Sequence, residues 1–242
     1  MEQPVEDVVA AAQAVWIARL VTIGIDVPSS MWQVEAAREH DDIFATVAIH
    51  PNEAHAADES AWAAIAQLAR EPKVVGVGET GLDHFRTTAD GWLQQEESFR
   101  RHIAIAKDAA KALVIHDRDA HDDVLRVLES EGAPDHVVFH CFSGDGEFAR
   151  RCVDRGYVLS FAGNVTFKNA QNLRDAAAVT PLDQLLVETD APFLTPMPYR
   201  GQPNAPYLVP ITVRAIAQAH NCSDDEVAMG VSATASRVFG WS

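Results

Sequence analysis

The stretch KVVGVGE, residues 73–79, decides how the rest of the chain is interpreted. It is a short apolar run rich in valine, and it ends on a charged residue, Glu79. An uninterrupted run of this kind is typical of a strand that is buried on both faces, as in a parallel sheet. Similar runs recur along the chain and end near Asp26, His50, His116, His140, Phe161 and Asp190. Together they predict seven strands, with polar–apolar helical stretches between them.

Strands that alternate with helices predict right-handed βαβ units, which build either a closed barrel or an open doubly wound sheet. Two features favour the barrel. No glycine-rich phosphate loop follows the first predicted strand, and ionisable residues end several non-adjacent strands, where a barrel gathers them around one mouth. We therefore expect an α/β fold of the (β/α)8 TIM-barrel type. A barrel normally begins with a strand, but this chain opens into a predicted helix, Val5 to Ala18, so the first strand is expected to be absent.

Helix starts are predicted by two capping boxes, Ser30 with Gln33 and Ser223 with Glu226. Residues 91–111 carry apolar side chains at amphipathic spacing and predict a longer helix. No linker, low-complexity run or charge block divides the 242 residues, so we expect one domain over residues 1–242.

The composition limits the classes of function. A formal net charge of −16 and a pI near 4.9 repel nucleic acid at long range, which argues against a sequence-reading DNA-binding module. A nucleic-acid substrate would have to be captured locally, by metal ions or a few arginines. Three cysteines without a CxxC pair indicate neither a disulfide framework nor a structural zinc site. With an acidic start and no apolar stretch of membrane-spanning length, we expect a cytoplasmic protein with no membrane contact and no obligate protein partner.

Four predicted strands end on ionisable residues that share a face with an apolar residue two or four positions earlier: Glu79, His116, His140 and Asp190. If those apolar residues point into a barrel, the four end residues converge at its mouth. Two imidazoles and two carboxylates suit a divalent metal ion. A hydrogen-bonded structural histidine explains any one position equally well, but four in phase on four strands favour a shared metal or catalytic site.

Five segments resemble the signature segments of the TatD family of metal-dependent deoxyribonucleases, in the same order and at similar intervals. They are GETGLD (78–83), IHDRDA (115–120), HCFSG (140–144), ETDAPFL (188–194) and PYRGQPNAP (198–206). AIHPNEA (48–54) resembles the third-strand segment of that family, and RVFG (237–240) its closing helix.

The resemblance implies roles for the four residues. Glu79 would bridge two divalent metals, His116 and His140 would hold one of them, and Asp190 would bind the other and position or deprotonate the attacking water. The implied enzyme is a divalent-metal-dependent hydrolase that cleaves phosphodiester bonds at the 3′ ends of DNA, with a metal-activated water as nucleophile. The implied cofactors are Mg, Mn or Zn ions.

The front of the chain departs from the family pattern. The family opens with a strand that carries a His-x-His pair, and both histidines bind the metal that Asp190 would also hold. No such pair occurs in this sequence, and residues 1–20 match the helix that follows it. We therefore expect one metal site here, where the complete family site holds two.

Residues for substrate binding are predicted at two places. Arg118 lies two positions beyond His116 and could bind phosphate through its guanidinium, or pair with Asp117 or Asp119 instead. A loop rich in proline and glycine could cover the barrel mouth and contact substrate, or simply form turns; its candidate residues are Tyr199, Arg200 and Asn204.

Four neighbouring residues allow other interpretations. Cys141 follows His140 and should face away from it, which argues against a Cys–His dyad. Glu188 is expected to contribute to packing and to hydrogen bonds behind the metal ligands rather than to bind metal itself. His50 could line the mouth, or mark a strand exit before Pro51, and His84 could reach the substrate or be merely exposed.

Two other functions remain open at this point. The same kind of metal site supports hydrolysis of a small amide, lactone or phosphoester, because fold and site do not fix the substrate. A chain without the His-x-His strand could also be a catalytically impaired protein that binds metal or nucleic-acid ends.

Overall fold

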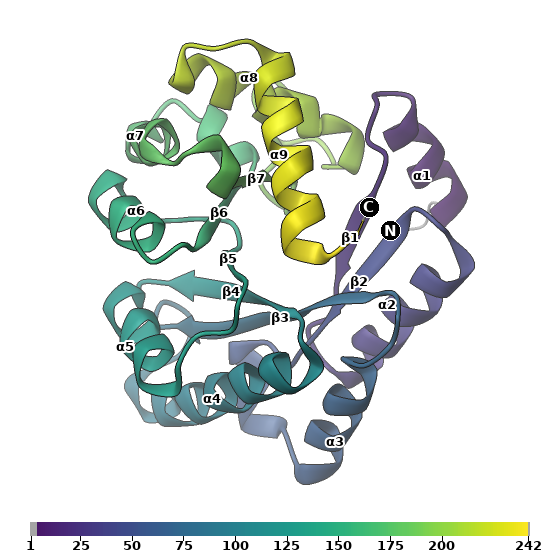
Figure 1. Cartoon of the computed structure of the whole chain (residues 1–242), viewed down its shortest axis with the longest axis vertical. Helices are drawn as coiled ribbons and strands as arrows, with labels where there is room; N and C mark the ends of the chain where they lie inside the picture. The colour runs from purple at the N-terminus through teal and green to yellow at the C-terminus, as the bar shows by residue number, and fades with distance from the viewer. Residues whose placement is uncertain (1–3, 242) are drawn as a thin grey trace. The chain divides into compact units, whose positions relative to one another are not determined.

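The computed structural model describes residues 4–241, in which strands and helices alternate along the chain (Figure 1). Contacts group them into two compact units. One unit is Val21–His140, and the other combines the N-terminal residues up to Leu20 with the chain from Cys141 onward.

The unit Val21–His140 is built on strands that are neighbours in chain order: β1 (Leu20–Ile23), β2 (Ile43–Val47), β3 (Val74–Asp83), β4 (Ala112–Arg118) and β5 (Val137–Phe139). The pairs β2–β3, β3–β4 and β4–β5 are parallel. Between the strands lie α2 (Val27–Glu39), α3 (Glu59–Leu68), α4 (Trp92–Ala109) and α5 (His121–Glu131), with short 3-10 turns η1 (Pro51–Ala56) and η2 (Ala89–Gly91).

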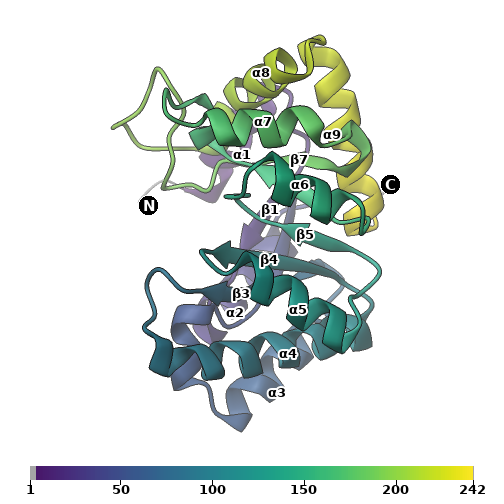
Figure 2. The same ribbon diagram turned by 90° about the vertical axis from the view of Figure 1, so that its left-hand side faces the viewer.

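The core of this unit lies between β3 and the helix α4, which runs beside the strands together with α5 (Figure 2). α4 turns Phe99, Ile103 and Ala106 inward, and none of them is more than 1% exposed. Their spacing of three and four residues places them on one face of the helix. The sheet side of the contact is apolar because nearly every residue of β3 is buried. This packing fixes β3, which carries Glu79.

Two glycines of β3 allow β4 to come close. A Cβ on Gly78 would lie 2.4 Å from the carbonyl oxygen of Val114, and one on Gly81 would lie 2.1 Å from that of His116. Gly81 also has φ +138, which other residues rarely adopt. The register pairs Gly81 with His116, so glycine is required at the point where β3 meets the histidine strand.

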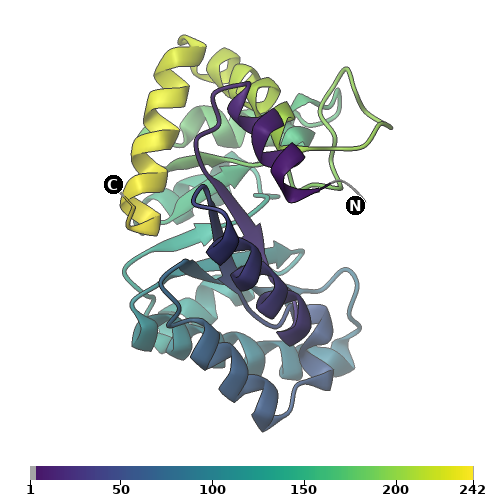
Figure 3. The same ribbon diagram turned by 90° about the vertical axis from the view of Figure 1, so that its right-hand side faces the viewer.

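The other unit holds the parallel pair β6 (Val158–Phe161) and β7 (Leu185–Val187). Its helices are α1 (Val5–Gln13), α6 (Gly146–Val153), α7 (Gln171–Val179), α8 (Val209–His220) and α9 (Asp224–Phe239), and its 3-10 turns are η3 (Gly163–Thr166), η4 (Leu182–Gln184) and η5 (Pro206–Leu208). Although α1 is distant from η5 in the sequence, the two lie side by side (Figure 3).

The helix starts agree with one predicted capping box and contradict the other. Ser223 caps α9 through the backbone N–H of Glu226, and the Glu226 side chain accepts from Ser223, as predicted. The box at Ser30 and Gln33 is wrong. α2 already begins at Val27, because Asp26 caps the backbone N–H of Ser29 and the following Pro28 favours the first helical turn.

All seven predicted strands are present in residues 4–241, so the predicted α/β fold with seven strands is confirmed. Their ends differ. β2 stops at Val47, before His50, and β3 continues past Glu79 to Asp83. The first helix ends at Gln13, earlier than predicted. Within the described residues, no helix is both long and apolar enough to span a membrane.

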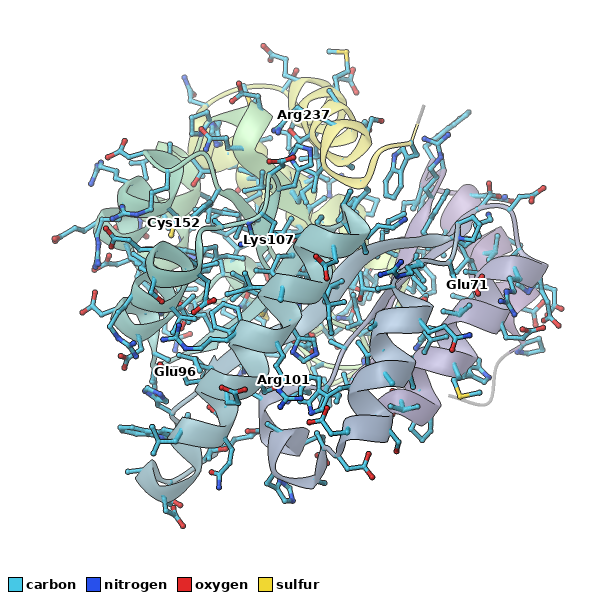
Figure 4. All side chains as sticks on the ribbon, turned by 60° about the horizontal axis from the view of Figure 1, so that its bottom comes forward. Glu71, Glu96, Arg101, Lys107, Cys152 and Arg237 are labelled. Carbon is cyan, nitrogen blue, oxygen red and sulfur yellow. The ribbon has the colours of Figure 1, made fainter. Side chains whose placement is uncertain are left out.

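Charged side chains on the outer face of α4 join it to α5. Glu96 accepts from Arg100 at 2.7 Å and from Arg126 at 2.6 Å, and Lys107 donates to the carbonyl of Glu131 at 2.9 Å. Figure 4 labels Glu96 and Lys107 on this helix. Ion pairs of this exposure contribute little each, so the apolar face determines how α4 packs.

Candidate metal centre

The centre of the site is the carboxylate of Glu79. Its Oε2 atom lies 3.3 Å from Nδ1 of His116 and 3.0 Å from Nε2 of His140. Glu79 is on β3, His116 on β4, and His140 directly follows β5. Because the three strands are parallel neighbours, their carboxyl-terminal parts lie at one edge of the sheet. The structure therefore brings Glu79, His116 and His140 together within this unit, as predicted.

Asp83 holds His116 from the other side. Its Oδ2 lies 3.2 Å from Nε2 of His116, so both ring nitrogens of this histidine face a carboxylate. The same oxygen accepts a hydrogen bond from Nδ2 of Asn52 at 3.2 Å. The other oxygen, Oδ1, accepts from the backbone N–H groups of Phe85 and Arg86. Asp83 is fully buried, which makes it a fixed support for the His116 ring.

His50 completes a group that could hold a metal ion. One ligand atom each from His50, Glu79 and His116 lie within 4.8 Å of one another. The ring of His50 stands edge-on to that of His116, with centroids 4.6 Å apart. Its Nδ1 accepts from the backbone N–H of Asn52 at 3.1 Å, which leaves Nε2 as the available ligand atom. Neutral imidazole nitrogens and a carboxylate are a donor set that suits a borderline divalent ion.

The charges of the group follow from its contacts. Burial alone would raise the pKa of Glu79, but His140 and His116 outweigh it and hold that pKa well below its ordinary value. Burial would lower the pKa of His116, but its bonds to Asp83 and Glu79 raise it. Burial lowers the pKa of His50 to about 4, so His50 is a neutral imidazole at pH 7. The Glu79 carboxylate and the neutral His50 imidazole are thus in the forms that bind metal, whereas a metal ion would have to displace a proton from His116.

Arg118 ends β4 and lies at the rim of the site. Its guanidinium carbon is 3.9 Å from the ring centroid of Phe85. Neither alternative pairing, with Asp117 or with Asp119, occurs among the ion pairs of residues 4–241, and the Asp117 carboxylate lies 2.7 Å from Nδ1 of His121 instead. Arg118 therefore presents its charge beside an aromatic ring, two residues beyond His116.

A cavity of about 360 Å³ opens next to the network of Asp83. Asn52 and Thr87 line it, and the Thr87 hydroxyl donates to Oδ1 of Asn52 at 3.0 Å. His84 does not line it and instead stacks on Trp92 with ring centroids 3.9 Å apart. The cavity is hence bounded by Asn52, which donates to Asp83, and by Thr87, which holds Asn52.

Asp190, the fourth predicted residue, lies in the other unit, in a tight turn that follows β7. It has φ 55, and its carbonyl accepts from the backbone N–H of Phe193. In the same unit, the Ser160 hydroxyl of β6 donates to the carboxylate of Glu188, which supports the Glu188 side chain two residues before Asp190.

The three predicted residues of the substrate loop differ in their exposure to solvent. Asn204 is 2% exposed, and its amide donates to the carbonyls of Thr189 and Phe193. Its polar atoms thus brace the loop, and its contact with substrate stays a prediction. Tyr199 is 44% exposed and lines a second cavity of about 720 Å³. Arg200 is exposed and lies over the ring of Phe167 at 4.4 Å.

Sequence reasoning missed Asp83, and it did not place His50 among the ligands. Asp83 ends the GETGLD segment and follows Glu79 by an even number of positions, which was the available signal for a shared face. His50 lies after its strand, in a turn whose conformation brings the ring back to His116.

A parallel α/β fold with a glutamate between histidines at the ends of its strands is the arrangement of a barrel-type, metal-dependent hydrolase. The sequence profile described as TatD related DNase matches residues 1–240. The chain therefore belongs to the TatD family, as its motifs indicated.

Known relatives agree with this assignment. The uncharacterized metal-dependent hydrolase TatD of Mycobacterium tuberculosis is 45% identical over 240 residues, which covers 98% of this chain and 91% of the relative. The uncharacterized metal-dependent hydrolase YabD of Bacillus subtilis is 39% identical over 235 residues, covering 97% and 92%. Among solved structures, the TatD homologue YJJV of Escherichia coli has a TM-score of 0.92 at 26% identity, covering 98% and 92%. The fold is thus TIM-barrel-like, and the protein is a metal-dependent hydrolase.

Proposed function

We propose that this hydrolase cleaves phosphodiester bonds of DNA at 3′ ends, with water as the nucleophile. The observation that carries the proposal is the position of Glu79, whose Oε2 lies within 3.3 Å of a ring nitrogen on each of His116 and His140. Such a centre suits a divalent metal, and the family to which the chain belongs is described by DNase activity. DNA ends are accordingly the proposed substrate.

The charge and position of each site residue indicate its role in metal binding. When bound, a divalent ion would polarise the phosphoryl oxygen and lower the pKa of a water toward neutrality. Glu79, His116 and His140 would hold it, and His50 supplies a further neutral nitrogen beside Glu79 and His116. Glu79 stays ionised because of its histidine neighbours, so it serves as a ligand and not as a proton donor.

Asp190 is proposed to orient or deprotonate the attacking water, as the TatD resemblance implies. Its carboxylate belongs to a turn with left-handed backbone geometry, which fixes the direction in which the side chain leaves the chain. Arg118, Tyr199 and Arg200 are the proposed substrate contacts, and a guanidinium suits a phosphate oxygen pair.

The test uses 3′-labelled single-stranded DNA, added Mg²⁺ or Mn²⁺ and a chelator control. We expect chelator-sensitive release of the label by the parent chain and none by Asp190→Ala. A second protein, extended at its N-terminus by a strand with a His-x-His pair, is run in parallel. If only the extended protein is active, the family activity holds but these 242 residues do not suffice for it.

A panel of small substrates separates the other functions. Cleavage of an amide, lactone or phosphomonoester without any cleavage of DNA would replace the proposal by a small-molecule hydrolase. Metal binding without turnover of any substrate would indicate a binding protein instead.

A further inference from the structure

An aromatic ring stands exposed beside the candidate metal centre. Phe85 follows Asp83 by two residues and is 63% exposed. Single apolar side chains on a surface are common and need no function. The surroundings of this ring are what distinguish it, because its backbone is held rigidly and one partner lies against its face.

The backbone of Phe85 is fixed by the metal-site network. Oδ1 of Asp83 accepts from the N–H of Phe85 at 3.0 Å and from that of Arg86 at 2.8 Å. The N–H of the preceding residue, His84, donates to the carbonyl of Arg118 at 2.9 Å. The ring is therefore presented from a preorganised loop, so that binding through it would cost little conformational entropy.

Arg118 lies against the ring of Phe85, with its guanidinium carbon 3.9 Å from the centroid. The register of β3 and β4 pairs Arg118 with Asp83. Phe85 follows Asp83 by two residues, which explains why its ring meets the Arg118 side chain. Within residues 4–241, no carboxylate forms an ion pair with this guanidinium. The pair thus combines an accessible aromatic surface with an uncompensated positive charge in a protein of net charge −16.

The pair is also close to the reacting centre. Arg118 is two residues beyond His116 on the same strand, a distance of about 6–7 Å along β4. Successive phosphates of a stacked nucleic-acid strand are about 3.4 Å apart along its axis. A nucleotide a few steps from the cleaved bond would therefore be at the distance of Arg118, and Phe85 lies against Arg118.

We propose that Phe85 and Arg118 form a stacking platform for an unpaired nucleobase, which directs the enzyme to single-stranded nucleic acid. The inference rests on the proposed function and adds to it a preference for unpaired strands. Aromatic side chains with a neighbouring arginine bind single strands by stacking on bases and attracting the backbone. Bases inside a duplex stack on each other and offer no free face, so a double-stranded end is used only when it frays.

An apolar protein partner fits the surface less well. The exposed apolar area here is one ring with a cation on its face, whereas protein partners use larger contiguous patches. The neighbouring His84 and Trp92 already stack on each other at 3.9 Å and are not part of the platform.

The first experiment compares Phe85→Ala, Phe85→Tyr and the control Leu93→Ala, which removes another exposed apolar side chain. The substrates are a single-stranded oligonucleotide and bis(p-nitrophenyl) phosphate, a phosphodiester without a base. We expect Phe85→Ala to lose roughly tenfold or more in kcat/KM on the oligonucleotide, mainly through KM, relative to any change on the small diester. Phe85→Tyr should restore most of the loss, and Leu93→Ala should match the parent.

The second experiment uses oligonucleotides with an abasic site at one of the last three nucleotides. For the parent, one of these positions should lower kcat/KM, and the same position should have no further effect on Phe85→Ala. Equal losses in parent and variant at every position would overturn the platform.

A binding measurement separates failure of the platform from failure of the proposed function. Phe85→Trp is titrated with oligothymidine in chelator, where no cleavage occurs, and stacking should quench its fluorescence more than that of the parent. A parent that cleaves no DNA, together with such quenching, would refute the nuclease and retain the platform. DNA cleavage with equal kcat/KM for Phe85→Ala and Leu93→Ala would refute the platform alone.

Discussion

His116 has carboxylates at both of its ring nitrogens, Glu79 at 3.3 Å and Asp83 at 3.2 Å. Such a ring is fixed in orientation before any metal arrives, and only one of the two carboxylates belongs to the ligand cluster. The other supports the ring, as carboxylates commonly do behind metal-binding histidines.

Replacing His116 by alanine removes a predicted ligand atom. We expect His116→Ala to weaken metal binding by about 100-fold or more and to leave hydrolysis far below that of the parent. Cys141→Ala is the control and should leave both nearly intact. Metal analysis after dialysis, with kinetics on the same samples, is the measurement. Unchanged metal content in His116→Ala would remove this residue from the ligand set.

Substitution of Asp83 tests whether a carboxylate that holds the His116 ring, without binding metal itself, affects metal affinity. Asp83→Asn keeps the size of the side chain but removes its charge, so we expect roughly 10–100-fold weaker metal binding. Asp90→Asn, which changes an exposed carboxylate in the turn η2, is the matched control. Competition with a chromogenic chelator measures both affinities. Equal affinities for the parent and Asp83→Asn would show that the ring of His116 needs no carboxylate behind it.

The sequence predicted Glu79, His116 and His140 because each ends an apolar run and falls in a recognisable motif. Asp83 was missed because β3 continues beyond its apolar part through Glu79 and Gly81, and charged residues and glycine are depleted in strands. Pairing with β4 extends the strand there, with a register shift between Val77 and Thr80. Such tertiary pairing overrides local propensity.

At the level of elements, α4 is attached to the sheet by a buried histidine. Nε2 of His102 accepts from the N–H of Ile49 at 3.0 Å, and its Nδ1 lies 2.8 Å from the carbonyl of Ser98 and 2.9 Å from the Thr80 hydroxyl. With Nε2 as acceptor, the ring must carry its proton on Nδ1. A second proton would turn Nε2 against a donor and break the contact with Ile49.

This contact predicts a dependence of stability on pH. Burial lowers the pKa of His102 from 6.5 to about 4. Between these two pH values the unfolded chain binds a proton at this histidine and the folded protein does not. The free energy of unfolding therefore falls as pH decreases from about 6.5 to about 4, by about 3 kcal/mol in total. Below that range the loss levels off.

Urea unfolding at several pH values between these limits checks the expectation, with chelator present to remove metal effects. His102→Gln should lose about one proton of pH dependence relative to the parent, whatever its absolute stability. His55→Gln, which changes an exposed histidine, should keep the parental dependence. Identical pH dependence in the parent and His102→Gln would place the titration elsewhere.

Capping-box spacing alone does not determine where a helix begins. The box at Ser223 and Glu226 was correctly predicted, because nothing before it competes for the helix start. The box at Ser30 and Gln33 was wrong, because Asp26 and Pro28 begin α2 earlier. Ser30 then lies inside the helix and is fully buried. A spacing rule alone does not rank two nearby caps.

At the scale of the whole molecule, charge is the property that the sequence determines directly. There are 35 acidic residues against 19 lysines and arginines. A protein that binds DNA along a basic groove releases counterions from many phosphates, and its affinity falls steeply with salt. This hydrolase is proposed to bind DNA through a metal centre and a few residues such as Arg118, so few counterions would be released.

The two electrostatic effects then oppose each other. Salt screens the long-range repulsion between an acidic protein and DNA, with a Debye length of about 10 Å at 0.1 M, and it weakens the few local contacts. We expect kcat/KM on single-stranded DNA to change less than about tenfold between roughly 50 and 200 mM NaCl at fixed metal concentration, where a basic groove loses 10³–10⁵ in affinity. Bis(p-nitrophenyl) phosphate, with a single charge, provides the reference series. A steep fall on DNA but not on the small diester would mean that many phosphates are contacted, and that binding extends well beyond the candidate metal centre and the platform of Phe85 and Arg118.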